Sequence, residues 1–96
     1  MEGTYAIASF RSRQQVMSFE GQLRRAGVRG EVVSTPREIA VGCGLSVRFD
    51  CADMERVREL CRQTPPQNMI GIYCAVRPEG GGLRTRFVPV MGSRGI

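Results

Sequence analysis

Residues 45–63, LSVRFDCADMERVRELCRQ, pass directly from a strand pattern to a helix pattern and decide the fold of this chain. In LSVRFD, hydrophobic and polar residues alternate, which is the period of a strand with one buried face. Asp50 predicts the start of a helix, because its carboxylate can accept hydrogen bonds from the free N–H groups of a first turn. From there to about Gln63, hydrophobic residues recur at three- and four-residue spacings, as a helix with one buried face requires. These residues are Met54, Val57, Leu60 and Cys61.

Strand and helix patterns also flank this unit on both sides. The first helix is expected to begin at Ser12, because Ser12 with Gln15 three positions later is a capping pair. The resulting order, β-α-β-β-α-β, predicts an α+β fold: a ferredoxin-like sandwich with two helices on one face of a four-stranded antiparallel sheet. The flanking elements are a strand at 4–10, a helix at 12–27 and strands at 28–35 and 69–76.

The end of the chain differs in composition from the rest. The 96 residues suffice for one small domain, which we place at residues 1–76. Residues 77–96 hold four arginines, one acid and three consecutive glycines. The segment LRTRFVPV (83–90) would suit an edge strand, but the glycines favour a basic, flexible C-terminal tail.

The charge balance does not favour nucleic acid as a partner. The net charge is +5, but every cation is an arginine, and the excess lies mostly in residues 77–96. No hydrophobic run approaches the about 20 residues that a membrane-spanning helix needs. The first ten residues, MEGTYAIASF, lack the basic start of a secretory signal. We therefore expect a cytoplasmic protein with no membrane partner.

The four cysteines are not arranged as metal ligands. There is no CxxC motif and no histidine, so the sequence predicts no metal site, no cofactor and no catalytic pair of serine or cysteine with histidine. Cys61 and Cys74 lie on hydrophobic faces of predicted elements and are expected in the core. Cys51 lies in the first turn of the predicted second helix. Cys43 alone lies in a loop.

That loop belongs to the stretch PREIAVGCGLSV (36–47), in which Cys43 stands between Gly42 and Gly44. The connection between the second and third strands is longer than most hairpin loops, and long loops often carry function. The two glycines could supply positive φ angles, or they could leave space for a partner to reach the sulfur. Arg37 is either a solvated loop charge or a cation that stabilises a thiolate. The residues alone leave both questions open.

Four features together resemble a family of small bacterial proteins described as putative Se/S carrier protein-like. They are a tyrosine in the first strand, a helix that ends in alanine-glycine, a proline-arginine-glutamate turn, and a cysteine-glycine pair that opens the third strand. The resemblance covers about residues 4–73. The matching residues are Tyr5, Ala26-Gly27, Pro36-Arg37-Glu38 and Cys43-Gly44.

The resemblance implies a sulfur or selenium carrier that holds a persulfide or a selenium–sulfur adduct and relays it between proteins. The donor would be a protein such as a cysteine desulfurase, and the acceptor a second protein. Such a chain is a covalent carrier more than a self-sufficient enzyme. The alternative is a non-catalytic regulatory or scaffolding module that binds a small ligand or protein, with the cysteine structural. An exposed strand edge would also allow homo-oligomers. In the carrier reading, Cys43 is the carrying thiol, Arg37 and then Arg48 the candidate cations, and Pro36, Gly42 and Gly44 the binding residues.

Overall fold

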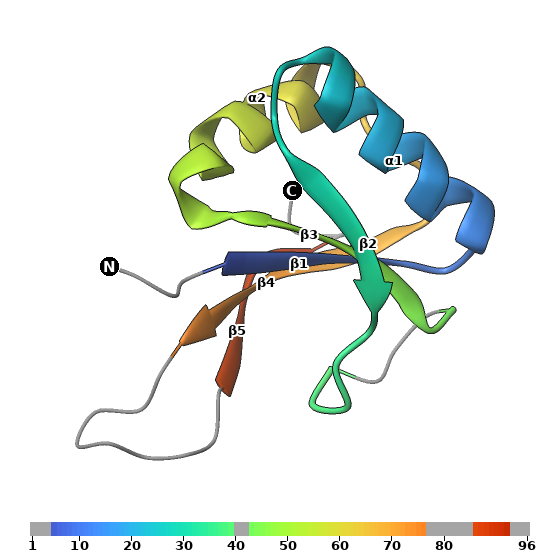
Figure 1. Cartoon of the computed structure of the whole chain (residues 1–96), viewed down its shortest axis with the longest axis vertical. Helices are drawn as coiled ribbons and strands as arrows, with labels where there is room; N and C mark the ends of the chain where they lie inside the picture. Colours follow the sequence, from blue (N-terminus) through green and yellow to red (C-terminus); the bar gives the residue numbers. More distant parts are fainter. Residues whose placement is uncertain (1–4, 40–42, 77–85, 93–96) are drawn as a thin grey trace.

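The structure is a computed structural model that describes residues 5–39, 43–76 and 86–92 (Figure 1). Its strands form one antiparallel sheet in the order β2-β3-β1-β4-β5, and helices α1 and α2 lie on the same face of that sheet (Figure 1). The α+β class, the two helices and the antiparallel sheet are thus confirmed. The elements are β1 (Tyr5–Phe10), α1 (Arg13–Arg25), β2 (Gly30–Ser34), β3 (Leu45–Asp50), the 3₁₀ turn η1 (Cys51–Asp53), α2 (Met54–Gln63), β4 (Met69–Val76) and β5 (Arg86–Gly92).

The sheet has a fifth strand that the sequence analysis assigned to a flexible tail. β5 pairs with β4 from the level of Gly71 to that of Val76. The prediction of a four-stranded sheet is therefore one strand short, and residues 86–92 are not a free tail; the remainder of 77–96 lies outside the described residues. The physical reason is the edge of β4, whose N–H and C=O groups need partners on the side away from β1. Pro89 fits β5 because a proline in a sheet belongs on an edge strand.

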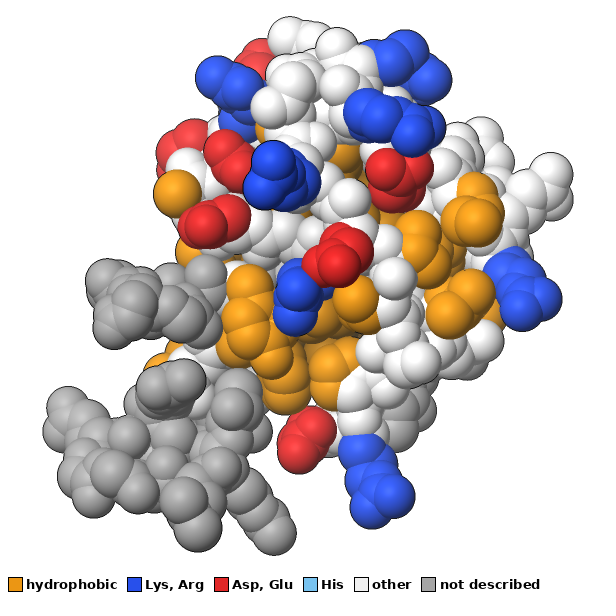
Figure 2. All heavy atoms as spheres, viewed as in Figure 1, with side chains coloured by type: hydrophobic (Ala, Val, Ile, Leu, Met, Phe, Trp, Pro, Cys, Tyr) orange, Lys and Arg blue, Asp and Glu red, His pale blue; other side chains and the backbone are white. Residues whose placement is uncertain are grey.

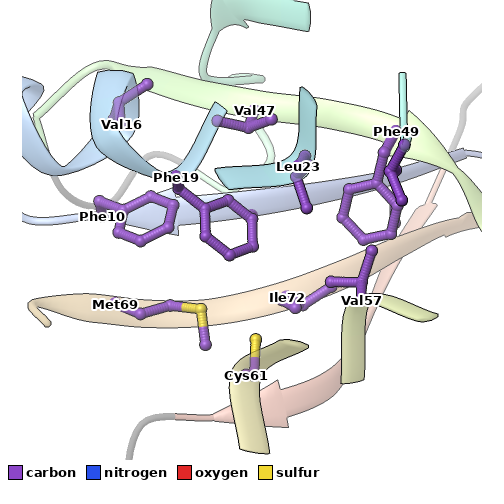
Figure 3. Close-up of a cluster of buried hydrophobic side chains, with 13 residues drawn as sticks. Phe10, Val16, Phe19, Leu23, Val47, Phe49, Val57, Cys61, Met69 and Ile72 are labelled. Carbon is purple, nitrogen blue, oxygen red and sulfur yellow. The ribbon is translucent and has the colours of Figure 1, made fainter. Parts of the chain in front are cut away.

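The main core lies between the sheet and the two helices. Val16, Phe19 and Leu23 form one buried stripe of α1, at the spacing that the sequence predicts. The rings of Phe10 and Phe19 pack with centroids 5.1 Å apart. From α2, Val57 reaches the same core (Figure 3). The other buried members shown in Figure 3 include Val47, Phe49, Cys61, Met69 and Ile72.

The two predicted helix starts have different outcomes. Ser12 caps α1 as expected: its hydroxyl accepts a hydrogen bond from the backbone N–H of Gln15 at 3.3 Å. Asp50 accepts a hydrogen bond from the N–H of Ala52 at 2.8 Å, but the turn that it caps is η1. α2 itself begins only at Met54. The 3₁₀ turn inserted between β3 and α2 matters for the site described below, because its first residue is a cysteine.

Candidate functional site

Cys43 lies where the long loop after β2 joins β3. Its backbone N–H donates to the carbonyl of Phe10 at 3.1 Å, so the cysteine sits at the end of the sheet where β1 finishes. Its side chain is half-buried and packs against the edge of the main core. The Sγ atom lies 3.6 Å from the carbonyl oxygen of Leu45, to which the S–H group can donate. The residue is thus partly exposed, and its position is fixed by the ends of two strands.

Gly44 fits both explanations given above for the glycines beside Cys43, a positive φ angle and space for a partner. Its φ angle is +90°, a conformation that side chains with a Cβ rarely adopt. Among the described residues, and apart from its chain neighbours, a Cβ built on Gly44 would also meet no atom within 4 Å. The backbone therefore favours glycine here, and the described residues leave the space beside the Gly44 Cα atom open. Thr35 fixes this conformation from across the loop by donating its N–H to the Gly44 carbonyl at 2.8 Å. Gly42 lies outside the described residues.

The predicted turn that begins at Pro36 is present. The N–H of Ile39 donates to the carbonyl of Pro36 at 2.9 Å, and the Ile39 side chain is only 8% exposed. Arg37 between them is exposed and, among the residues that the structure describes, makes no hydrogen bond or ion pair. The structure therefore gives no contact between Arg37 and Cys43, and the role of Arg37 as a thiolate stabiliser stays a prediction.

Arg48, the second candidate cation, contacts Glu31 and Tyr5. Its guanidinium lies 2.7 Å from the Glu31 carboxylate and stacks over the ring of Tyr5, 5.4 Å from the centroid. Phe87 of β5 packs edge-on against Tyr5 with centroids 6.3 Å apart. Hydrophobic side chains are exposed over the sheet in this region, with charged side chains around them (Figure 2). This contact was not predicted from the sequence, because Phe87 lies in the segment expected to be a flexible tail.

A pair of thiols that the sequence analysis did not bring together lies at the other end of the sheet. The Sγ atoms of Cys51 in η1 and Cys74 in β4 are 3.1 Å apart. Cys74 was expected in the core, but it is half-buried, as is Cys51. Burial, together with the hydrogen bond and the charge interaction with Cys74, raises the pKa of Cys51 to about 12. The two cysteines are 23 positions apart in the chain, so no local motif links them.

Cys61 is confirmed as a core residue. Its side chain is buried in α2 against the sheet, and this burial raises the pKa of its thiol. A buried thiol held in its protonated form is a poor nucleophile. Cys61 is therefore the natural control for experiments on the other three cysteines.

The described part of the chain holds no cluster of three or more cysteine, aspartate or glutamate side chains placed to bind a metal ion. Within the same residues, neither helix has the length and hydrophobicity needed to cross a bilayer.

Comparison with known proteins gives one match. The sequence model of the family described as putative Se/S carrier protein-like matches residues 5–74, a span that runs from β1 into β4, includes Cys43, and ends before β5. No curated protein matches the chain, and no solved structure does.

Proposed function

Because the chain belongs to the putative Se/S carrier protein-like family, we propose that it carries zero-valent sulfur or selenium on the thiol of Cys43. The observation that carries this proposal is the position of Cys43 within the matched region. Cys43 is partly exposed, it lies at the end of the sheet, and a Cβ on the adjacent Gly44 would meet no other described residue within 4 Å apart from its chain neighbours. A carrier needs such access because both its donor and its acceptor must reach one sulfur atom.

The chemistry consists of two balanced exchanges. In loading, the Cys43 thiolate attacks the outer sulfur of a donor persulfide, R–S–SH, and the donor leaves as its thiolate. Cys43 becomes Cys43–S–SH, or Cys43–S–SeH where the donor carries selenium. In unloading, an acceptor thiolate attacks the outer atom and Cys43 leaves as a thiolate. The electrons for each bond come from the bond that breaks, so neither step needs a cofactor or an oxidant.

The hydrogen bond from Cys43 explains how the thiol is held between loads. A protonated thiol can donate to the Leu45 carbonyl, but a thiolate has no proton to donate. Ionisation therefore removes this contact and frees the sulfur to turn toward a partner. The loop that carries Pro36 and Arg37 ends at Cys43, so we assign this loop to the docking of donor and acceptor. Gly42 and Gly44 have no side chains and would let a partner approach the sulfur.

The partners follow from the same chemistry. A protein that generates a persulfide, such as a cysteine desulfurase acting on cysteine, would load Cys43 in the cytoplasm, and a second protein would accept the atom. The outer edges of β2 and β5 offer unpaired backbone groups through which two copies could also associate.

For the fold, we propose that the order β2-β3-β1-β4 and the helices form a ferredoxin-like unit within residues 1–76. In this division, β5 is an addition beyond the matched family region.

The test is loading by a cysteine desulfurase with cysteine, read by intact mass under non-reducing conditions. We expect the full-length protein to gain one sulfur atom, which dithiothreitol then removes. The Cys61→Ser variant should load like the wild type, and Cys43→Ser should not load. An unchanged mass of the wild type, or equal loading of Cys43→Ser, would rule out Cys43 as the carrier.

A second function has one observation in its favour. The half-buried Cys43 side chain packs on the core edge and bonds Leu45, as a structural cysteine would. In that case the chain is a non-catalytic module that binds a small ligand or protein. Labelling of the folded protein with iodoacetamide separates the two. A carrier thiol reacts much faster than Cys61, whereas a structural thiol reacts at a similar rate.

A further inference from the structure

The Cys51–Cys74 pair is created by the order of the strands. β3 and β4 are the two neighbours of β1. Cys51 directly follows β3, and Cys74 lies in β4 opposite Ala6 of β1. The chain therefore brings two thiols from separate elements to 3.1 Å across the strand between them.

The β1 residue opposite Cys74 is small, which favours this contact. Neighbouring strands are about 4.8 Å apart, so side chains from β3 and β4 are separated by twice that spacing unless they lean over β1. Paired residues of adjacent strands point to the same face, and Ala6 is fully buried on the helix side. Ala6 pairs with Phe49 of β3 and with Cys74 of β4, and its single methyl group adds little bulk beside Cys74. A disulfide bond is about 2.05 Å long, so bond formation needs them to move only about 1 Å closer.

This pair is separate from Cys43. The N–H of Cys43 bonds to Phe10 at the last residue of β1, whereas Cys74 lies opposite Ala6, near the first. Four residues of strand, about 13 Å, separate the two levels. The pair therefore requires a chemistry of its own.

We propose that Cys51 and Cys74 are a redox-active dithiol that reduces low-molecular-weight disulfides and is itself converted to an intramolecular disulfide. In the first step, the Cys74 thiolate attacks one sulfur of a disulfide R–S–S–R; a Cys74–S–S–R bond forms and one R–S⁻ leaves. In the second, Cys51 gives up its proton and attacks the Cys74 sulfur, and the second R–S⁻ leaves. Two protein thiols lose two electrons in total, and one disulfide is reduced to two thiols.

The environment of the pair sets the order of the two steps. Burial and the contact with Cys74 raise the pKa of Cys51, which disfavours attack by Cys51 as the first step. Once Cys74 is in the mixed disulfide, it carries no negative charge and its hydrogen bond with Cys51 changes. Two of the causes that raise the pKa of Cys51 are then weakened. Cys51 consequently ionises more readily at the step in which it must attack. Both side chains are half-buried, so a small disulfide can reach the pair.

The test uses the reduced full-length protein and excess glutathione disulfide as the probe, followed by alkylation of the remaining thiols. Intact mass and peptide mapping then locate each bond. We expect the wild type to lose two hydrogen atoms at Cys51 and Cys74 and to contain a disulfide between them, with any glutathione on Cys43 located separately by the mapping. The Cys51→Ser variant should stop with glutathione attached to Cys74. The Cys74→Ser variant should take up glutathione at Cys51 at least tenfold more slowly than Cys74 does in Cys51→Ser.

Two controls keep the result specific. Cys61→Ser and Cys43→Ser should each form the disulfide at the wild-type rate, which also makes this proposal independent of the carrier function. Far-UV circular dichroism of each variant checks that the fold is retained. A wild-type protein that forms no bond between residues 51 and 74, or that is glutathionylated first on Cys51, would overturn the proposal. Alanine in place of serine at each position provides a second set of variants if a serine variant does not fold.

Discussion

Gly44 allows the backbone and the reactivity of the proposed carrier site to be tested with one substitution. In Gly44→Ala, the added methyl group meets no atom of the described part of the chain within 4 Å beyond its two neighbours in sequence, so no clash is expected there. The φ angle of +90° remains, and holding an L-residue in the left-handed region costs about 1–2 kcal/mol. We therefore expect the free energy of unfolding to fall by about 1–2 kcal/mol from backbone strain alone.

Urea denaturation followed by circular dichroism measures this cost. With a slope of about 1–2 kcal/mol/M for a small protein, the midpoint should fall by about 1 M with the slope unchanged. Gly44→Asn should lose less, because asparagine tolerates positive φ better than alanine. If Gly44→Ala unfolds at the wild-type midpoint, residue 44 does not hold a positive φ angle in solution and the argument fails.

Gly27 supplies a matched control in the same chain. It also has a positive φ angle, +82°, and within the described part of the chain a Cβ there would approach only the guanidinium end of Arg56, at 3.8 Å. Gly27→Ala should therefore carry a similar strain, but at the end of α1, away from Cys43. Only Gly44→Ala should slow persulfide transfer from a protein donor, since its methyl group occupies the space that a partner would use. Iodoacetamide should label Cys43 equally in both variants. If Gly44→Ala and Gly27→Ala lose persulfide transfer equally, the loss results from reduced stability and not from the space beside Cys43.

Three further outcomes follow from the packing and the thiol pair. The pKa of Cys51 is about 12 in the folded chain, against 9.0 for a free cysteine, so the free energy of unfolding should decrease as pH rises from about 9 toward 12. Urea titrations should show a smaller decrease in Cys51→Ser. A Cys51–Cys74 disulfide closes a loop between positions 23 apart, so by loop entropy the oxidised protein should be about 3 kcal/mol more stable than the reduced one in the same assay. Leu23→Ala, at a fully buried position, should cost about 2–5 kcal/mol, whereas Met17→Ala, 57% exposed on the same helix, should change stability by less than about 0.5 kcal/mol.

The secondary structure was largely predictable because its signals are local. The α1 stripe of Val16, Phe19 and Leu23 follows from spacing, and the Ser12 cap follows from one residue pair. The alternation in β3 likewise fixes which side chains face the helices, and Val47 and Phe49 are both buried. Each of these features depends on residues that are neighbours in the sequence.

β5 could not be predicted with the same ease, because its stability is a property of the sheet. Residues 86–92 contain a proline and follow a glycine run, which locally favour irregular structure. β5 pairs with the edge of β4 that faces away from β1. The pairing therefore depends on the assembled sheet and not on residues that are neighbours in the sequence. The local pattern in LRTRFVPV was a genuine strand signal that the surrounding composition outweighed.

In the candidate site, too, local features could be predicted from the sequence and non-local contacts could not. The position of Cys43 at the end of the loop, just before β3, was predictable, because a loop–strand boundary is a local feature. The contact between Cys51 and Cys74 was not, since it depends on the strand order, on the register that sets Cys74 opposite Ala6, and on the 3₁₀ turn that begins at Cys51. Cys74 was assigned to the core from alternation alone, and alternation does not show how far along a strand the core extends.

The separation of the two thiol sites constrains how they can act together. A persulfide on Cys43 could in principle be reduced by the Cys51–Cys74 dithiol, which would release hydrogen sulfide and leave the disulfide. About 13 Å of β1 lies between the two levels, and Cys43 is tied to the strand end through the Phe10 carbonyl. The reaction therefore needs the dithiol of a second molecule, and its rate must rise with the square of the protein concentration. A release rate per molecule that does not change on dilution would show that the loop carrying Cys43 moves across the sheet, in conflict with this geometry.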